Sequence, residues 1–435
     1  MSPFNKVEFK ETKLREDFMK GSRVKGFYQL SVEERVNLIA KDVGLTHDEV
    51  NILSNGMSLD LADAMVENVI GQISIPLGVA ANFKVNGKDV FIPMATEEPS
   101  VIAAASNAAR AAYDLGGIYT ATSGTIMRGQ IQVLDICDPY AARARVYENK
   151  EEIIEQCNLK DPTLVSLGGG VKDIEVHLIN TVKETMLVIH LIVDTKDAMG
   201  ANAVNTMAEY VSPFIEKMTG GRVVLRIITN LADKRVVRAR GVFSSEMLGG
   251  EEIVKNIVSA FEFADADPYR AATHNKGVMN GITSVVLATG NDTRAVEAGA
   301  HAYASRTGRY RSLTTWELNK EGNLVGTLEV PMAVGIIGGA TKTHPVAQVA
   351  LKIMGVKTAE ELAGMIAAVG LTENAASLRA LSAEGIQTGH MRLHAKNLAI
   401  MAGAKGDLIE KVVQKAIEEK DFRYDRILEI TNSLK

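Results

Sequence analysis

Two periods of hydrophobic and polar positions run along the middle of the chain. Apolar residues occur at every second position in 131–134, 175–179 and 186–193, which is the period of a β-strand with one buried face. In 201–218 they recur every three or four positions, so this segment is expected to form an amphipathic helix that ends at the glycine pair 220–221. The middle of the chain is therefore predicted to mix α and β structure.

Helices outside this region carry clear start signals. Segments 31–43 and 46–54 each open with Ser or Thr and have Glu three residues later, the capping-box pattern. An alanine-rich helix is predicted over 100–115, entered through Pro99 and ended by two glycines. A further helix is predicted over 407–419, with one apolar stripe formed by Leu408, Ile409, Val412, Val413, Ala416 and Ile417.

Length and charge narrow the class of protein. A chain of 435 residues allows two or three domains, and the strand-rich stretch between about 124 and 225 is expected to be an inserted one. The net charge of -5 and pI of about 6.0 give no electrostatic footprint for nucleic acid. One basic cluster alternates with Val and Ala and is expected on the solvent face of a strand: Lys234, Arg235, Arg238 and Arg240.

The chain shows no segment of the kind that secretion or membrane insertion requires. Residues 1–23 mix both charge signs and lack the apolar core of a signal peptide, and the apolar stretch 330–340 is too short to span a bilayer. The only cysteines, Cys137 and Cys157, form no disulfide framework and suit a reducing cytoplasm. We expect a soluble cytoplasmic enzyme with no membrane partner, in which both cysteines are small buried side chains.

The densest group of chemically useful residues lies in 267–277 and 290–292. Arg270, Lys276 and Asp292 stand among Gly, Asn and Thr inside an apolar region, where unpaired charge would be costly. This pattern predicts an active site. The alternative is a structural ion pair, with Asp292 as the N-cap of a helix over 293–300.

A second candidate site lies at 191–202, where a buried strand leads through a short polar turn into a helix. Backbone amides at that helix start can hold a pyrophosphate, and Gly200 would allow close approach. The segment is not the G-x-G-x-x-G fingerprint of a Rossmann fold. The alternative is structural, because Asp197 and Asn202 are also common turn and cap residues.

The remaining candidates also have structural alternatives. His390 and His394 are spaced i, i+4, but Met391 follows the first, so the H-E-x-x-H zinc pattern is absent. No third ligand stands out, and we expect no metal site, with His394 structural. Glu98 lies beside Glu97 just before a predicted helix, where it could simply complement the helix dipole.

Five motifs, in order and at similar spacing, resemble those of 3-hydroxy-3-methylglutaryl-CoA reductase in its soluble class II branch. They lie at 67–71, 96–100, 197–202, 267–292 and 389–391, and the resemblance runs from about Phe27 into the C-terminal region. It implies an α/β fold with a large helix-rich substrate domain, an inserted small non-Rossmann dinucleotide-binding domain and a mobile C-terminal flap. The implied boundaries are 1–123 and 230–377 for the large domain, 124–229 for the small domain and 378–435 for the flap.

The resemblance implies a two-step, four-electron reduction of hydroxymethylglutaryl-CoA to mevalonate and CoA with two NAD(P)H, or the reverse oxidation, in the mevalonate pathway. CoA is then part of the substrate and product. It also implies a homodimer or an assembly of dimers, with 67–71 near the interface. Two other classes stay open from the residues alone: a CoA thioester acyl transferase or hydrolase without redox chemistry, which would need a nucleophile, and a ligand-binding protein without catalysis.

The resemblance also assigns roles in the chemistry. Lys276 would hold the negative oxygen that each hydride transfer creates, and Glu98, if protonated, would donate a proton to the aldehyde oxygen. Asp292 would bridge these two residues and favour the protonated form of Glu98. His390 would protonate the departing CoA thiolate, which suits a group that titrates near neutral pH. The substrate's free carboxylate would be bound by Arg270, Ser100 and Asn280.

Two assignments within the resemblance have competitors. In the membrane-anchored branch the catalytic lysine comes from a loop that matches 230–235, so Lys234 competes with Lys276; the soluble-branch motif over 272–277 favours Lys276. Asp161 falls where relatives that use NADH carry an acidic residue for the ribose 2′-OH, although the neighbouring Lys160 could serve NADPH instead. The implied cofactor-binding residues are Asp161, Asp197, Met199, Gly200, Asn202 and Asn230.

Overall fold

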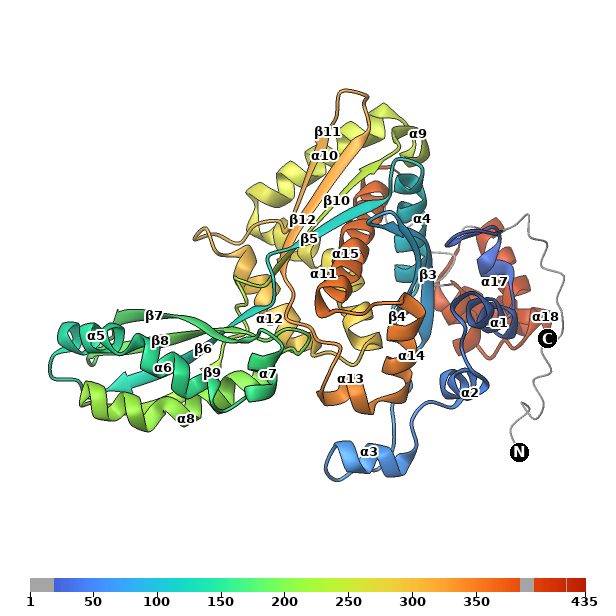
Figure 1. Ribbon diagram of the computed structural model, residues 1–435. Helices are drawn as coiled ribbons and strands as arrows, with labels where there is room; N and C mark the ends of the chain where they lie inside the picture. The colour runs from blue at the N-terminus through green and yellow to red at the C-terminus, as the bar shows by residue number, and fades with distance from the viewer. Residues whose placement is uncertain (1–18, 384–394, 420) are drawn as a thin grey trace.

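A computed structural model describes residues 19–383, 395–419 and 421–435. In this part of the chain a six-stranded and a four-stranded sheet carry most of the architecture, and helices cover both (Figure 1). The α/β class expected from the sequence is confirmed. No helix in the described ranges is long and apolar enough to cross a membrane.

Strands from both ends of the sequence form the six-stranded sheet. Its order is β11-β12-β10-β5-β3-β4, and all neighbours are antiparallel except β3 and β5. Its strands are β3 (Leu77–Val85), β4 (Lys88–Ala95), β5 (Ile118–Thr122), β10 (Val236–Phe243), β11 (Thr314–Leu318) and β12 (Leu324–Pro331). Segments before residue 123 and after residue 235 therefore fold as one unit, as an inserted domain between them requires.

One long helix lies at the centre of this unit. Helix α15 (Ala359–Ser382) is buried along most of its length, and it packs against β5, β10 and the two helices that carry the candidate site. Those helices are α4 (Val101–Tyr113) and α11 (Pro268–Ala288). Because α15 has little solvent-facing surface, polar groups on it must find partners inside the protein or stay neutral.

The four-stranded sheet lies entirely within 126–228. Its order is β7-β8-β6-β9, all antiparallel, and the predicted strands at 131–134, 175–179 and 186–193 lie in three of its members. The predicted helix over 201–218 is α8 and is also confirmed. The elements are β6 (Ile126–Leu134), α5 (Pro139–Glu148), α6 (Lys150–Asn158), α7 (Pro162–Ser166), β7 (Gly170–Asn180), β8 (Thr185–Asp194), α8 (Ala201–Thr219) and β9 (Arg222–Ile228).

The N-terminal helices begin where the capping signals predicted. Ser31 and Glu34 exchange both capping-box hydrogen bonds at the start of α1 (Val32–Val43), and Thr46 and Glu49 do the same for α2 (His47–Asn55). The other described elements are β1 (Met19–Lys20), β2 (Arg23–Val24), η2 (Phe27–Gln29), α3 (Leu59–Met65), α9 (Ser245–Leu248), α10 (Glu251–Ala266), α12 (Thr293–Ala304), α13 (Gly339–Thr343) and α14 (Pro345–Met354).

The C-terminal segment has a hydrophobic core of its own. Helices α17 (Asp407–Glu419) and α18 (Tyr424–Leu434) bury Val412, Val413 and Ile427 in a cluster whose members all come from 395–430. The apolar stripe predicted for 407–419 is therefore used inside the segment and not against the central sheet. This arrangement is that of a separately packed unit.

Two expectations about single residues are wrong. Arg235 was expected on the exposed face of a strand with Arg238 and Arg240, yet it is 4% exposed while the other two face solvent. It lies just before β10, and its side chain contacts the segments that follow β8 and β12. Cys157 is buried, as expected, and burial raises the pKa of its thiol to about 12. Cys137, in contrast, is exposed because it lies in the loop after β6.

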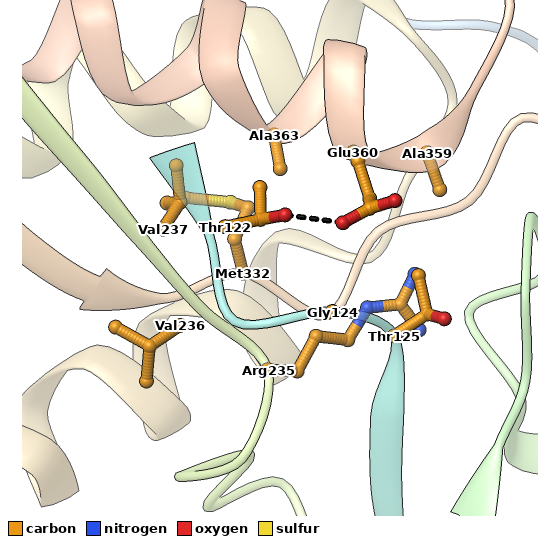
Figure 2. A pocket seen from close by; sticks show the side chains of 10 residues that line it. All are labelled: Thr122, Gly124, Thr125, Arg235, Val236, Val237, Met332, Ala359, Glu360 and Ala363. Atoms are coloured by element: carbon orange, nitrogen blue, oxygen red, sulfur yellow. Dashed lines mark hydrogen bonds between the residues drawn. The ribbon is translucent and has the colours of Figure 1, made fainter. Parts of the chain in front are cut away.

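Arg235 connects the segments that follow β8 and β12 through their backbone carbonyls. Figure 2 shows its side chain near Thr125, among the residues that line a pocket. Its guanidinium donates to the carbonyl of Ala198 at 3.0 Å, to that of Met199 at 3.2 Å and to that of Val334 at 2.6 Å. It also donates to the Thr195 hydroxyl at 2.9 Å. The turn at 195–199, part of the candidate cofactor motif, is thus held to the large unit by one buried cation.

Replacing Arg235 with methionine should lower the free energy of unfolding by about 3 kcal/mol, because several buried carbonyls would lose their donor. Chemical denaturation measures the change. The matched control is Arg240→Met, at an exposed position of β10, which should change stability by less than about 0.5 kcal/mol. Equal losses in the two variants would contradict the structural role of Arg235.

Candidate active site

Glu98 is presented by a loop with unusual backbone geometry. Strand β4 ends at Ala95, and the backbone amide of Glu98 donates to the Thr96 hydroxyl at 3.2 Å. Ser100, the residue before α4, has a φ of 78° and does not cap the helix with its side chain. A non-glycine residue held in the left-handed region costs about 1 kcal/mol or more, and such outliers gather at functional sites.

Helix α11 brings two of the predicted residues to Glu98. The Lys276 ammonium lies 2.9 Å from Glu98 Oε2, and the Asn280 amide donates to the same oxygen at 3.4 Å. Lys276 and Asn280 are one helical turn apart, so both reach the same carboxylate. The side chains are 61% exposed for Lys276 and 38% for Glu98. An exposed pair of this kind contributes only about 0–1 kcal/mol to stability.

The competing lysine has a different partner. Lys234 Nζ lies 3.0 Å from Glu175 Oε1, on the four-stranded sheet. Arg128 contacts the same carboxylate, and together the two cations hold the pKa of Glu175 at about 2 despite its partial burial. Lys276, and not Lys234, is therefore the lysine that contacts Glu98 in this structure.

Asp292 is held at the start of α12. Its carboxylate accepts from the backbone amides of Arg294 at 2.9 Å and Ala295 at 3.1 Å, and it pairs with the Arg294 side chain at 3.3 Å. In the described chain it makes no ion pair with Lys276, so the expected bridge to Glu98 is not formed here. All of these contacts are made by Oδ1, in the N-cap role that the structural alternative for Asp292 predicted.

Arg270 is a half-buried cation that has no carboxylate partner in the described part of the chain. It stands in the first turn of α11, which Asp267 caps by accepting from the Arg270 amide at 3.1 Å. Burial lowers the pKa of its guanidinium, and no ion pair to it is formed among the described residues. A guanidinium in this state favours an incoming carboxylate, which it can bind through two parallel hydrogen bonds.

The start of α8 fits a dinucleotide phosphate. Gly200 has a φ of 106°, and a Cβ added there would lie 2.4 Å from Thr195 Cγ2, so only glycine suits the position. No side chain caps the helix, and Asn202 is exposed in its first turn. The free amides and the positive end of the helix dipole are the features that bind phosphate.

Other predicted cofactor residues have structural contacts. Asp197 accepts at 2.8 Å from the Ala359 amide in the first turn of α15, whose N-cap is Thr358. Asp161 caps α7 by accepting from the Leu164 amide at 2.9 Å. The carbonyl of Met199 accepts from Arg235, and Asn230 is exposed beside the four-stranded sheet. His390 and His394 lie outside the described residues.

Two features of the structure were not expected from the sequence. Glu175, His177 and His190 place possible ligand atoms within 4.8 Å of one another. The Arg128 and Lys234 cations beside this carboxylate oppose a further cation. The other feature is Glu373, a buried acid on α15 near Glu98. The signal for it is a lone Glu in the apolar run 362–375.

Comparison with known proteins identifies the family. The family model described as hydroxymethylglutaryl-coenzyme A reductase matches residues 31–395. The chain belongs to this family. It is 58% identical to the reductase of Archaeoglobus fulgidus over 415 residues, 95% of either chain. It is 34% identical to a Borreliella burgdorferi protein named as a probable reductase, over 93% of this chain and 90% of the relative.

Solved structures of the reductase family share the fold. A Streptococcus pneumoniae reductase matches with a TM-score of 0.81 and 38% identity, covering 94% of this chain and 99% of the other. A structure of the class II enzyme from the same organism, bound to NADPH, matches with a TM-score of 0.79 and 39% identity, over 82% and 99%. The chain is therefore a hydroxymethylglutaryl-CoA reductase of the mevalonate pathway, and its structural match is to the class II enzyme. The non-redox thioester transferase or hydrolase is not supported.

Proposed function

We propose that the chain reduces hydroxymethylglutaryl-CoA to mevalonate and CoA at a site built on Glu98 and Lys276. The observation that carries the proposal is their 2.9 Å contact, which joins two motifs 178 residues apart in the sequence. The same site would also run the reverse oxidation, since each role reverses with the direction of proton transfer.

Separate residues stabilise the developing negative charge and donate the protons. A bound nicotinamide supplies the hydride for each of the two steps. As negative charge grows on the substrate oxygen, the Lys276 ammonium stabilises it, and Glu98 in its acid form supplies the proton. The ammonium now held by Glu98 is exposed enough to turn toward a substrate oxygen. His390 protonates the leaving thiolate.

The guanidinium of Arg270 is the group that binds the substrate's carboxylate. Arg270 binds the carboxylate at the far end of the hydroxymethylglutaryl group, since it is half-buried and lacks a partner among the described residues. Ser100 and Asn280 donate to the same group; the Ser100 side chain is not used to cap α4. Orienting this end fixes the thioester carbon relative to Lys276.

The dinucleotide lies on the small unit, with its pyrophosphate at the start of α8 beside Gly200 and Asn202. Met199, Asp197 and Asn230 shape the surrounding turns. We propose NADH as the preferred cofactor, with NADPH as the alternative. Asp161 uses Oδ1 to cap α7, which leaves Oδ2 for a ribose hydroxyl, while the Lys160 ammonium lies 4.1 Å from the Tyr210 ring centroid.

Asp161→Ala should lower the ratio of kcat/KM for NADH to that for NADPH by about tenfold, the effect of losing a hydrogen bond to a charged group. Asp161→Asn is the matched control for the helix cap, since it keeps the acceptor for Leu164 and removes only the charge. It should shift the ratio in the same direction. An unchanged ratio in both variants would show that Asp161 does not choose the cofactor.

One surface of the chain exposes large apolar side chains. The segment between α3 and β3 has no regular structure, and Ile70 and Ile73 within it are 104% and 93% exposed. Large apolar side chains left in water in this way mark interaction surfaces. We propose a homodimer, or an assembly of dimers, in which this segment lies against the partner and the CoA.

Mixing two inactive variants tests whether the site is shared. If Lys276 and His390 meet across the interface, refolding Lys276→Ala and His390→Ala chains together should restore about a quarter of the activity, because half of the dimers are mixed and each has one complete site. Each variant refolded alone is the control. No recovery would place both residues in one chain, and a monomer by light scattering would exclude the dimer.

The reaction itself is tested by following reduced nicotinamide and free CoA together. Reduction predicts the loss of about two nicotinamides for each CoA released. Release of CoA without loss of the nicotinamide would mean hydrolysis or transfer. Binding of the thioester with neither change would mean that the chain is not catalytic.

A further inference from the structure

Glu373 is a buried carboxyl group that the chemistry above does not use. It lies in the middle of α15, is 4% exposed, and its Oε2 has no hydrogen-bond partner among the described residues. An ionised carboxylate with one unpartnered oxygen in such a place would be costly, whereas a neutral acid is tolerated. The residue is therefore held as an acid until the pH is high enough to remove its proton.

The packing of α15 on α11 places Glu373 beside the active-site residues. A Cβ added at Gly281 would lie 3.0 Å from Glu373 Cβ and 2.9 Å from the Val369 carbonyl, so the two helices approach closely at this point. Gly281 follows Asn280, which contacts Glu98. One turn earlier, a Cβ added at Gly277 would lie 3.7 Å from the Ser377 hydroxyl. The acid thus faces the stretch of α11 that carries Lys276 and Asn280.

The charges that act on Glu373 are those of the catalytic pair. Burial is the main cause that raises the pKa of its carboxyl to about 8; the Glu98 charge raises it further, while Lys276 and the backbone of Ala105 oppose the rise. These groups come from the loop before α4, from α11 and from α4, and no other charge acts on it within the described chain. The Lys276 ammonium thus acts on two carboxyl groups, those of Glu98 and Glu373.

We propose that Glu373 is a positioning residue for Lys276: as a neutral acid it leaves the ammonium to Glu98 and the substrate oxygen, and once ionised it draws the ammonium away. Ionisation adds a buried negative charge that attracts the Lys276 ammonium and competes with Glu98 for it. Turnover then falls because the substrate oxygen loses part of its stabilisation. This inference rests on the proposed function and identifies a residue that limits turnover at alkaline pH.

The test is the pH profile of kcat for the wild type and Glu373→Gln. The wild type should lose activity above an apparent pKa of about 8. Glu373→Gln keeps the shape but cannot ionise, so its activity should match the wild type within about threefold at pH 7 and persist above that limit. Glu361→Gln, the same change in the first turn of α15, is the control and should keep the wild-type profile. Identical alkaline limbs in the wild type and Glu373→Gln would overturn the proposal.

Stability gives a second readout that does not need activity. Between the ordinary pKa of 4.5 and about 8, folded Glu373 keeps a proton that the unfolded chain releases. The unfolding equilibrium constant of the wild type, relative to that of Glu373→Gln, should therefore rise about tenfold per pH unit across this window and level off above it. A flat ratio would show that the carboxyl is ionised in the folded chain and would refute the proposal.

The proposal for Glu373 and the proposed function can fail separately. If the ratio rises but the wild type does not oxidise reduced nicotinamide with hydroxymethylglutaryl-CoA at pH 7, the proposed function is the one that fails.

Discussion

Replacing Lys276 with alanine should lower kcat for hydroxymethylglutaryl-CoA reduction by about 100-fold or more, because the developing oxyanion loses its stabilising cation. The fold should survive, since the Lys276 and Glu98 side chains are well exposed and such a pair contributes about 0–1 kcal/mol. Steady-state kinetics measure the loss of kcat, and denaturant unfolding verifies that the variant is folded.

Lys234→Ala is the matched control for this result. It removes the same side chain from the only other lysine that the family resemblance offers, and that lysine contacts Glu175 and not Glu98. We expect it to keep most of its activity. Should Lys276→Ala retain more than about a tenth of the wild-type rate, the cation at the oxyanion would have to be another residue, with Lys234 the first candidate.

Local sequence rules predicted the elements well. The capping boxes at Ser31 and Thr46 mark helix starts through contacts between residues three apart, so no distant part of the chain can alter them. The same holds for α8, whose apolar face is periodic and whose end is a glycine with positive φ. These signals depend only on neighbours along the chain.

The site was predictable where a motif names a residue, and less so where packing decides its role. Glu98 and Lys276 stood out in their motifs, but their contact follows from the packing of α11 beside the end of β4. Asp292 was assigned a bridge between Lys276 and Glu98, whereas among the described residues it caps α12 and forms no ion pair with Lys276. Both roles were open from the sequence, since an N-cap and an active-site acid need the same residue type.

Arg235 and Glu373 show why some buried residues could not be recognised from the sequence. Arg235 belongs to an alternating basic pattern typical of an exposed strand, and only its contacts with the distant turn at 195–199 and with Val334 account for its burial. Glu373 interrupts an apolar helix pattern, a weak sign by itself. Its importance comes from lying near Glu98, which is 275 residues earlier in the chain. Burial of this kind is a property of tertiary packing, and no local period encodes it.

The C-terminal segment bears on how the reaction is completed. In the proposed mechanism His390 approaches the thioester sulfur, yet an oxidised nicotinamide has to be exchanged between the two hydride steps, so a permanent cover would block turnover. Residues 395–430 share a core with one another and not with the central sheet. A unit with its own core can move as one body without exposing apolar surface. We propose that it acts as a flap that closes over the bound substrate.

Truncation after Ala383 should reduce kcat for hydroxymethylglutaryl-CoA by about 1000-fold, within the range expected for loss of a general acid together with exclusion of water. Reduction of free mevaldehyde should fall by less than about tenfold, because no thiolate has to be protonated. Binding of the nicotinamide, measured by fluorescence, should change little, since α8 and the turn before it remain.

The point variant His390→Ala in the full chain separates the loss of the proton donor from the loss of closure. A loss of kcat equal to that of the truncation would assign the effect to the proton donor, and a smaller loss would assign the remainder to closure. Equal losses for mevaldehyde and the thioester, or hydrogen exchange in 395–430 that ligands do not alter, would exclude the flap.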